Sequence, residues 1–202
     1  MMVFATIAAF GKKSKDDSKY LVGAVPEVNG MVTFTKSFRV NNHSTADIHK
    51  VMQQFVGNLV ENSISAPGNY ARIMDDKDNC ITARVCEWLV FNKKPLNLDR
   101  ARFRYQIEAK TEGDRVNITV TNITYYYNED METNNGFIIK AEEWITDREA
   151  LNKKQTKLYP KSGKFRRKTV DRANGIFSAA MDAFEPKEEP VAKPVRKGVV
   201  ED

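Results

Sequence analysis

The chain has little of the chemistry that supports most recognisable sites. It contains two cysteines and two histidines among 202 residues, and we expect these to form neither a disulfide framework nor a four-ligand zinc site. There is no glycine-rich loop of the kind that holds nucleotide phosphates. Mean hydropathy is -0.54, which leaves no room for a membrane bundle. We therefore predict no cofactor, no metal ion and no transmembrane segment in the mature chain.

The four cysteine and histidine positions also argue against an enzyme. Cys80 and Cys86 share one expected strand, so their Cα atoms would lie about 20 Å apart, whereas a disulfide needs less than about 7 Å. His43 and His49 fall on different sides of an expected helix, and neither has a serine or cysteine nucleophile at a motif spacing. We predict a protein that is not an enzyme.

Composition and patterning indicate one domain between two tails. A hydrophobic content of 41% and a charged content of 29% are typical of a globular chain. Residues 185–202 alternate charge with proline and lack apolar periodicity, so we expect a solvated, disordered tail. We assign residues 20–184 to a single domain and residues 1–19 to a signal-peptide remnant and linker.

The first ten residues, MMVFATIAAF, match the apolar core of a signal peptide, and small residues follow at Ala9 and Gly11. A basic segment before this core is missing, so we expect the natural start to lie upstream. The alternative is an ordered N-terminal element of the domain. On the first interpretation the protein is exported, either to the periplasm or out of the cell.

Hydrophobic periodicity gives the first half of the fold. Two extended runs, 20–28 and 31–40, flank Asn29-Gly30, which is a strong hairpin signal. Ser44 begins a helix with apolar residues at helical spacing, and Pro67-Gly68 closes it. The apolar helix positions are Ile48, Val51, Met52, Phe55 and Leu59.

Four extended runs then form an antiparallel meander, followed by two helical regions. The runs are 69–74, 80–91, 100–110 and 115–127, with the first turn at residues 75–78. The helical regions are 141–154 and the segment after Pro160. We predict an α+β fold with helices on one face of an antiparallel sheet. The expected shared core contains Phe38, Phe55, Ile107, Val120 and Phe177.

Three stretches carry a resemblance to a known family. They are Val28-Asn29-Gly30 with MVTFTKSFRV, then AEEWITDREALNKK, and then KFRRKTVDRANGIF. The chain resembles the secreted Bacteroidetes family called domain of unknown function 4468, with a TATA-binding-protein-like (TBP-like) fold. The resemblance implies export and no established activity, and the fold name does not imply DNA binding.

The strongest charge feature is the segment 152–172, with nine basic residues and one acidic residue. The simplest interpretation is a solvated helix face, and the alternative is a site for an anionic partner such as lipid headgroups, polysaccharide or nucleic acid. Aromatic residues are sparse here, so nucleic acid is the least expected partner. The candidate anion-binding residues are Lys153, Lys154, Lys157, Lys164, Arg166, Arg167, Lys168 and Arg172.

Two further groups have both structural and functional interpretations. Tyr125, Tyr126 and Tyr127 end the last strand, as ordinary packing or as an aromatic rim for a ligand. Four acidic residues between 142 and 149 suit the first turns of a helix or, alternatively, a metal site. We predict a module that binds a protein partner or a small apolar ligand, with anionic-surface binding through 153–172 as the second hypothesis.

Overall fold

Long antiparallel strands form one sheet, and two helices lie across one of its faces. The computed structural model describes residues 16–65, 69–94, 97–127 and 136–185. The strand order is β3 (Phe34–Arg39), β7 (Arg115–Tyr127), β6 (Asn97–Glu112), β5 (Cys80–Lys94) and β4 (Arg72–Lys77). A short strand, β8 (Phe137–Lys140), pairs with the end of β7 on the side where β3 pairs with its beginning. This arrangement confirms the predicted α+β fold.

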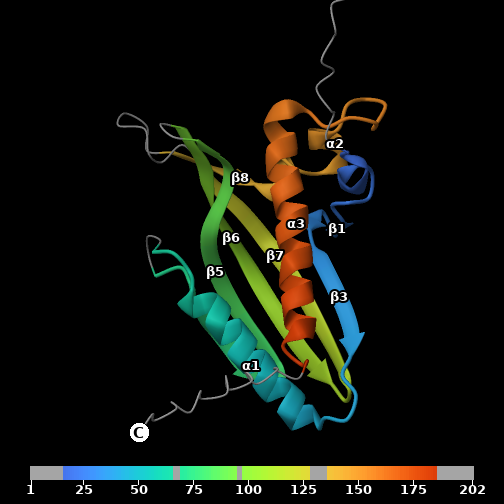
Figure 1. The fold of residues 1–202 in the computed structure, drawn as a ribbon, viewed down its shortest axis with the longest axis vertical. Helices are drawn as coiled ribbons and strands as arrows, with labels where there is room; N and C mark the ends of the chain where they lie inside the picture. The colour runs from blue at the N-terminus through green and yellow to red at the C-terminus, as the bar shows by residue number, and fades with distance from the viewer. Residues whose placement is uncertain (1–15, 66–68, 95–96, 128–135, 186–202) are drawn as a thin grey trace, which may run out of the picture.

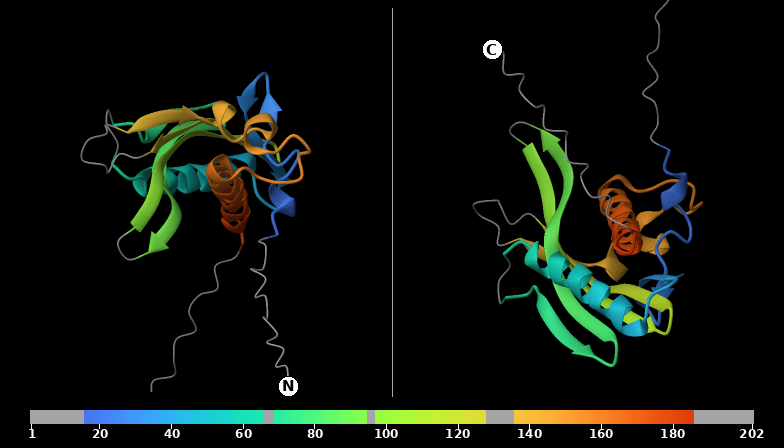
Figure 2. Two further views of the ribbon diagram at one scale, coloured as in Figure 1. Left: turned by 90° about the horizontal axis from the view of Figure 1, so that it is seen from above. Right: turned by 60° about the horizontal axis from the view of Figure 1, so that its bottom comes forward.

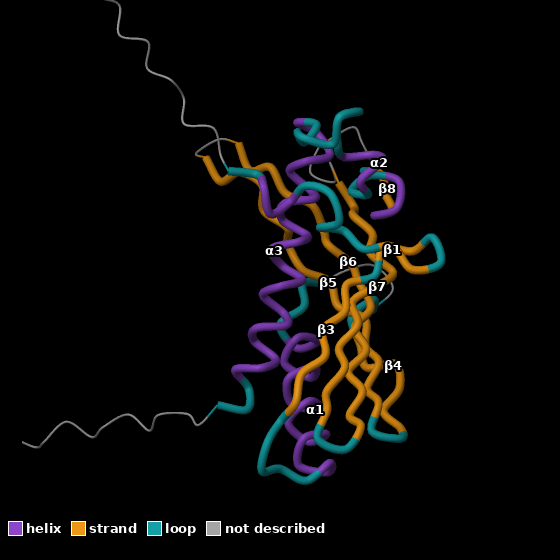
Figure 3. Tube along the Cα trace, turned by 90° about the vertical axis from the view of Figure 1, so that its right-hand side faces the viewer, coloured by secondary structure: helices purple, strands orange, loops and turns teal. Residues whose placement is uncertain are grey.

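Helix α1 (Thr45–Glu61) and helix α3 (Pro160–Asp182) both cover the same face of the sheet (Figure 1). Seen from above, the sheet curves around them, so they lie on its concave side (Figure 2). In the side view, α1 and α3 both lie to one side of the strands, and the described segments place no long helix on the other side (Figure 3). We call this uncovered side the outer face.

Helix α1 begins where the sequence predicts. The Ser44 hydroxyl accepts a hydrogen bond from the Asp47 backbone N–H at 3.1 Å and donates one to the Asp47 carboxylate at 2.6 Å. This cap satisfies a donor that the first helical turn leaves unpaired. The helix ends at Glu61, whereas the predicted closing signal, Pro67-Gly68, lies outside the described residues.

Helix α3 has proline in its first turn, where the missing N–H costs nothing. Gly163 is required by close packing, because a Cβ there would lie 2.8 Å from the Leu158 Cβ. Phe165, Ile176 and Phe177 are buried against the sheet. Of the five residues expected at the core, Ile107, Val120 and Phe177 are buried, whereas Phe38 and Phe55 are only partly buried.

Turn residues decide where the first strands lie. The Asn29-Gly30 turn is confirmed, with φ of 52° and 78°, but it joins only two-residue strands, β1 (Glu27–Val28) and β2 (Met31–Val32). Residues 20–26 are not extended as predicted: they contain the end of a short 3-10 helix, η1 (Ser18–Tyr20), and a turn at Gly23, where φ is +79°.

Strand β4 also differs from the prediction, because it includes Asp75, Asp76 and Lys77. The turn falls instead at Asp78-Asn79, both with positive φ, which Asp and Asn tolerate better than most residues.

The prediction of a helix over 141–154 was largely wrong. The structure has a 3-10 turn, η2 (Ala141–Glu143), and a four-residue helix, α2 (Asp147–Ala150). The Asn152 side chain accepts hydrogen bonds from the backbone N–H groups of Thr156 and Lys157, and Leu151 pairs with Leu158 across this turn. The side chain therefore offers the backbone an alternative to the helix. Strand β8 was not predicted.

Candidate interaction surface

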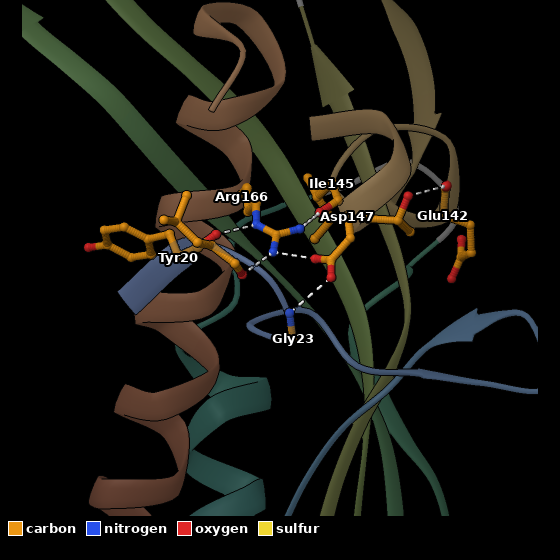
Figure 4. A network of polar contacts seen from close by, with 8 residues as sticks. Tyr20, Gly23, Glu142, Ile145, Asp147 and Arg166 are labelled. Atoms are coloured by element: carbon orange, nitrogen blue, oxygen red, sulfur yellow. Dashed lines mark hydrogen bonds and ion pairs between the residues drawn. The ribbon is translucent and has the colours of Figure 1, made fainter. Parts of the chain in front are cut away.

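Arg166, a candidate anion-binding residue, is fully buried. Its guanidinium donates hydrogen bonds to the backbone carbonyls of Tyr20, Leu21 and Ile145 at 2.6–2.7 Å and to the Asp147 carboxylate at 2.5 Å (Figure 4). The other oxygen of that carboxylate accepts the Gly23 N–H. Arg166 thus joins α3 to the N-terminal segment and to α2, and no external anion reaches it.

Three more of the eight candidates are paired with carboxylates. Lys164 contacts Asp99 at 2.6 Å, and Arg172 contacts Glu87 at 2.7 Å. Arg167 makes two hydrogen bonds to Asp17, and these raise its pKa. The segment 16–19, which we assigned to a linker, therefore contacts the domain.

The other four candidates, Lys153, Lys154, Lys157 and Lys168, have exposed side chains. Since half of the eight cationic groups are neutralised within the protein, the basic segment does not form one free anion-binding surface. The four paired residues connect α3 to neighbouring elements.

The three tyrosines at the end of β7 do not share a face. A bulge at Asn122, where φ is +53°, shifts the inward and outward alternation of β7 by one residue. The buried side chains are therefore even-numbered up to Val120 and odd-numbered from Ile123, and Tyr125 is buried. The Tyr125 hydroxyl hydrogen-bonds to Thr169 at 2.7 Å in the core, and burial raises its pKa. Tyr127 donates to Asp99, while Tyr126 lies on the outer face. The predicted rim is therefore divided between the two faces.

Three of the four acidic residues between 142 and 149 serve as hydrogen-bond or ion-pair partners. Glu142 accepts the Val32 N–H at 2.8 Å, Asp147 binds Arg166, and Glu149 pairs with Arg148. No group of three or more His, Cys, Asp or Glu residues that could hold a metal ion occurs within the described ranges. These contacts, rather than the dipole of a long helix, account for the acidic side chains.

A cluster that the sequence analysis did not single out lies on the outer face. Even-numbered positions of β5 and β6 point away from the helices, and in register Trp88 lies opposite Arg102, and Cys86 lies opposite Arg104. Tyr70, from the segment before β4, covers part of the same face. We call this cluster the outer patch; it comprises Tyr70, Arg84, Trp88, Arg100, Arg102, Arg104 and Tyr126.

Guanidinium groups stack on the rings of the outer patch. The Arg100 Cζ lies 3.7 Å from the centre of the Trp88 ring, and that of Arg102 lies 5.1 Å from it. The Arg104 Cζ is 5.1 Å from the Tyr70 ring and 5.8 Å from the Tyr126 ring. Such cation–π contacts contribute about 0.5–1 kcal/mol each at exposed sites and more when desolvated. All seven side chains are partly buried.

Two ionisable groups report the environment of the patch. Burial raises the pKa of the Cys86 thiol, although the neighbouring Arg104 opposes that rise. Burial also raises the pKa of Tyr70, opposed by the charges of Arg84 and Arg104. The ring and the thiol are therefore neutral near pH 7, and the arginines dominate the local charge.

An open groove lies between α1 and the end of α3. It has a volume of about 650 Å³ and is lined in part by Val51, Phe55 and Phe184. Gln54 and Asn58 also line it, so its surface is mixed rather than apolar.

Comparison with known proteins gives the chain's relatives. A crystal structure of a DUF4468 family protein from Bacteroides ovatus matches with 38% identity and a TM-score of 0.75, over 87% of this chain and 99% of that one. The chain belongs to the DUF4468 family. The family model, a domain of unknown function with a TBP-like fold, matches residues 34–126 of this DUF4468 chain. This confirms the resemblance drawn from the sequence.

A TBP-like protein from Parabacteroides distasonis shares the fold of this DUF4468 protein at 18% identity, with a TM-score of 0.64, over 80% of this chain and 97% of the other. None of the curated proteins matches the chain. The family match spans β3 to β7, so it includes all seven residues of the outer patch.

One signal for the outer patch was present in the sequence. In the stretch RARFRY, Arg100, Arg102 and Arg104 alternate with Ala101 and apolar rings, which places three arginines on one face of a strand. Their pairing with Trp88 depends on strand register, and the position of Tyr70 depends on a loop. Those two features required the tertiary structure.

Proposed function

We propose that this DUF4468 protein is a non-enzymatic module that binds a protein partner through the outer patch. The observation that carries the proposal is the composition of that patch: Trp, Tyr and Arg side chains gathered on the sheet face that no described helix covers. These three residue types are enriched among the residues that dominate protein–protein binding energy.

The geometry of the patch favours binding for an entropic reason. Arginine loses rotamer freedom when a partner immobilises it, at a cost of about 0.5–1.5 kcal/mol for each such side chain. Here the guanidinium groups of Arg100 and Arg104 already rest on aromatic rings. Folding has therefore already restricted much of the rotamer freedom of these arginines, and a partner would bind a preformed surface.

The non-enzymatic part of the proposal is supported by the separation of reactive groups. His49 lies on α1 and contacts Asp76 at 3.0 Å, whereas Cys86 lies on the opposite face of the sheet. His43 contacts a backbone carbonyl near the start of α1. Neither histidine is paired with a cysteine or serine nucleophile in the residues that the structure describes.

The partner-binding test compares the whole protein with two variants. Immobilised wild-type protein and Tyr159→Ala, which removes an exposed ring elsewhere, should retain the same protein from the native cell envelope. Tyr70→Ala/Trp88→Ala should retain at least about tenfold less, since a hot-spot residue contributes about 2 kcal/mol or more. Circular dichroism confirms that each variant is folded. Equal retention by all three proteins, measured by quantitative mass spectrometry, would show that the patch is not the binding surface.

We also propose that the protein is exported, on the strength of the apolar run in residues 1–10. This run lies outside the described residues, and no helix of the described part is long and apolar enough to cross a membrane. Expression in the native host should yield a mature protein beginning near residue 12 in the periplasmic or extracellular fraction. Recovery of the intact N-terminus in the cytosol would contradict export.

A further inference from the structure

Cationic side chains on the two faces of the sheet differ in how their charge is compensated. On the helix-covered face, Lys164, Arg166 and Arg172 each contact a carboxylate within 2.7 Å. On the outer face, Arg84 and Arg104 form no ion pair with any carboxylate of the described residues, and both lie instead beside the Tyr70 ring.

The strand register explains why these two charges remain uncompensated. Arg84 lies opposite Arg72 on β4 and opposite Gln106 on β6. Arg104 lies opposite Cys86 on β5 and opposite Thr124 on β7. None of these cross-strand neighbours is acidic, and one is a further arginine. The nearest acidic side chains in register, Asp75 and Glu108, both lie opposite Thr82, and neither forms an ion pair with Arg84 in the described residues.

The surroundings of Arg104 fix the orientation of its side chain. Its Nε atom is buried and has no hydrogen-bond partner. Its guanidinium lies between the Tyr70 and Tyr126 rings, which fix the direction of its remaining donors.

We propose that Arg84 and Arg104 bind carboxylates of an acidic segment of a protein partner. This inference rests on the proposed function and specifies the chemistry of the partner. A carboxylate can accept two parallel hydrogen bonds from a planar guanidinium, which gives both strength and orientation. Two such groups flanking one ring select a partner with two acidic side chains close together.

The rings favour an acidic polypeptide over a single-stranded nucleic acid. Sequence-tolerant binding of single strands depends on bases stacking on aromatic rings. In the outer patch, the Trp88 ring already has the Arg100 guanidinium 3.7 Å from its centre, and Tyr70 has arginines beside it. With guanidinium groups on the rings, the patch presents charge rather than stacking platforms.

The test titrates fluorescently labelled poly-L-glutamate into the full-length protein and follows anisotropy at about 20 mM ionic strength, where screening is weak. The double variant Arg84→Gln/Arg104→Gln should bind at least about tenfold more weakly, because each lost charge-assisted hydrogen bond is worth about 1.5 kcal/mol or more. The control Lys36→Gln/Lys50→Gln removes the same charge from exposed side chains and should stay within about twofold of the wild type.

A second variant, Arg84→Lys/Arg104→Lys, keeps both charges and removes the planar groups. It should bind more weakly than the wild type, and it decides the question if the glutamine variant fails to fold. The proposal is overturned by equal weakening in the control, by unchanged binding of the lysine variant, by no binding of the wild type, or by tighter binding of oligo-dT than of polyglutamate. If envelope capture still depends on Tyr70 and Trp88, such a result removes the acidic chemistry and leaves partner binding in place.

Discussion

Replacing Arg166 with alanine tests what the basic segment does. The change removes hydrogen bonds to three backbone carbonyls and to Asp147, and Arg166 itself is completely buried. Bonds to charged groups contribute about 1.5–3 kcal/mol each, so four would give an upper limit of about 6–12 kcal/mol. Asp147 is a quarter exposed, so it regains water when its partner is lost. Breaking a buried pair by removing one member costs about 3–5 kcal/mol, and we expect this loss of stability.

Urea unfolding followed by circular dichroism measures the effect. With an m-value of about 2 kcal/mol per molar urea, Arg166→Ala should lower the midpoint by about 2 M without changing m. Arg167→Ala is the matched control, since Arg167 pairs with Asp17 at a site about one quarter exposed, and it should cost about 1 kcal/mol.

The double variant Arg166→Ala/Asp147→Ala should lose less stability than the two single changes added together, because the two residues share one interaction. A loss below about 1 kcal/mol for Arg166→Ala would refute the argument. It would mean that the N-terminal segment and α2 do not depend on α3 for their positions.

Three other changes test the core, the helix cap and the buried thiol. Phe177→Ala should lower the free energy of unfolding in urea by about 3–5 kcal/mol, as large core truncations do. Phe55→Ala should cost less than half as much, because Phe55 is only partly buried beside the open groove. Equal losses for the two variants would contradict this packing. Ser44→Ala should cost about 1 kcal/mol through loss of the cap to α1, and no change would mean that the cap is not formed in solution. Burial raises the pKa of Cys86, so its thiol should stay protonated at pH 8 and react with a thiol reagent only as fast as the protein unfolds. The stability that the buried, neutral Cys86 thiol contributes is fully present below the unfolded-state thiol pKa of about 8.5, and it is lost as pH rises toward the higher folded-state pKa. Rapid labelling of Cys86 in the folded protein at pH 8 would contradict its burial.

Local signals in the sequence were sufficient for much of the fold. The Ser44 cap, the Asn29-Gly30 turn and the alternation along β6 depend on residues within a few positions of one another, and all three are present in the structure. The prediction failed where a side chain competed with the backbone. Asn152 binds the backbone of Thr156 and Lys157, and that contact replaces the helix that the surrounding composition favours.

The sequence by itself determined the fold class, because hydrophobic periods of two and 3.6 residues are local and identify a sheet face or a helix stripe directly. The family followed from the resemblance of three sequence stretches. Only the tertiary structure decided the roles of the charges. Arg166 meets the Tyr20 carbonyl across 146 positions of sequence, and Arg104 meets Tyr70 only because strand register and a loop bring them together. Four residues of the basic run therefore form ion pairs that connect α3 to other segments. Arg84 and Arg104, which form no ion pair with a carboxylate of the described residues, lie on the opposite face of the sheet. The physical reason is that charge compensation depends on distances between segments remote in sequence, and no local pattern specifies those distances.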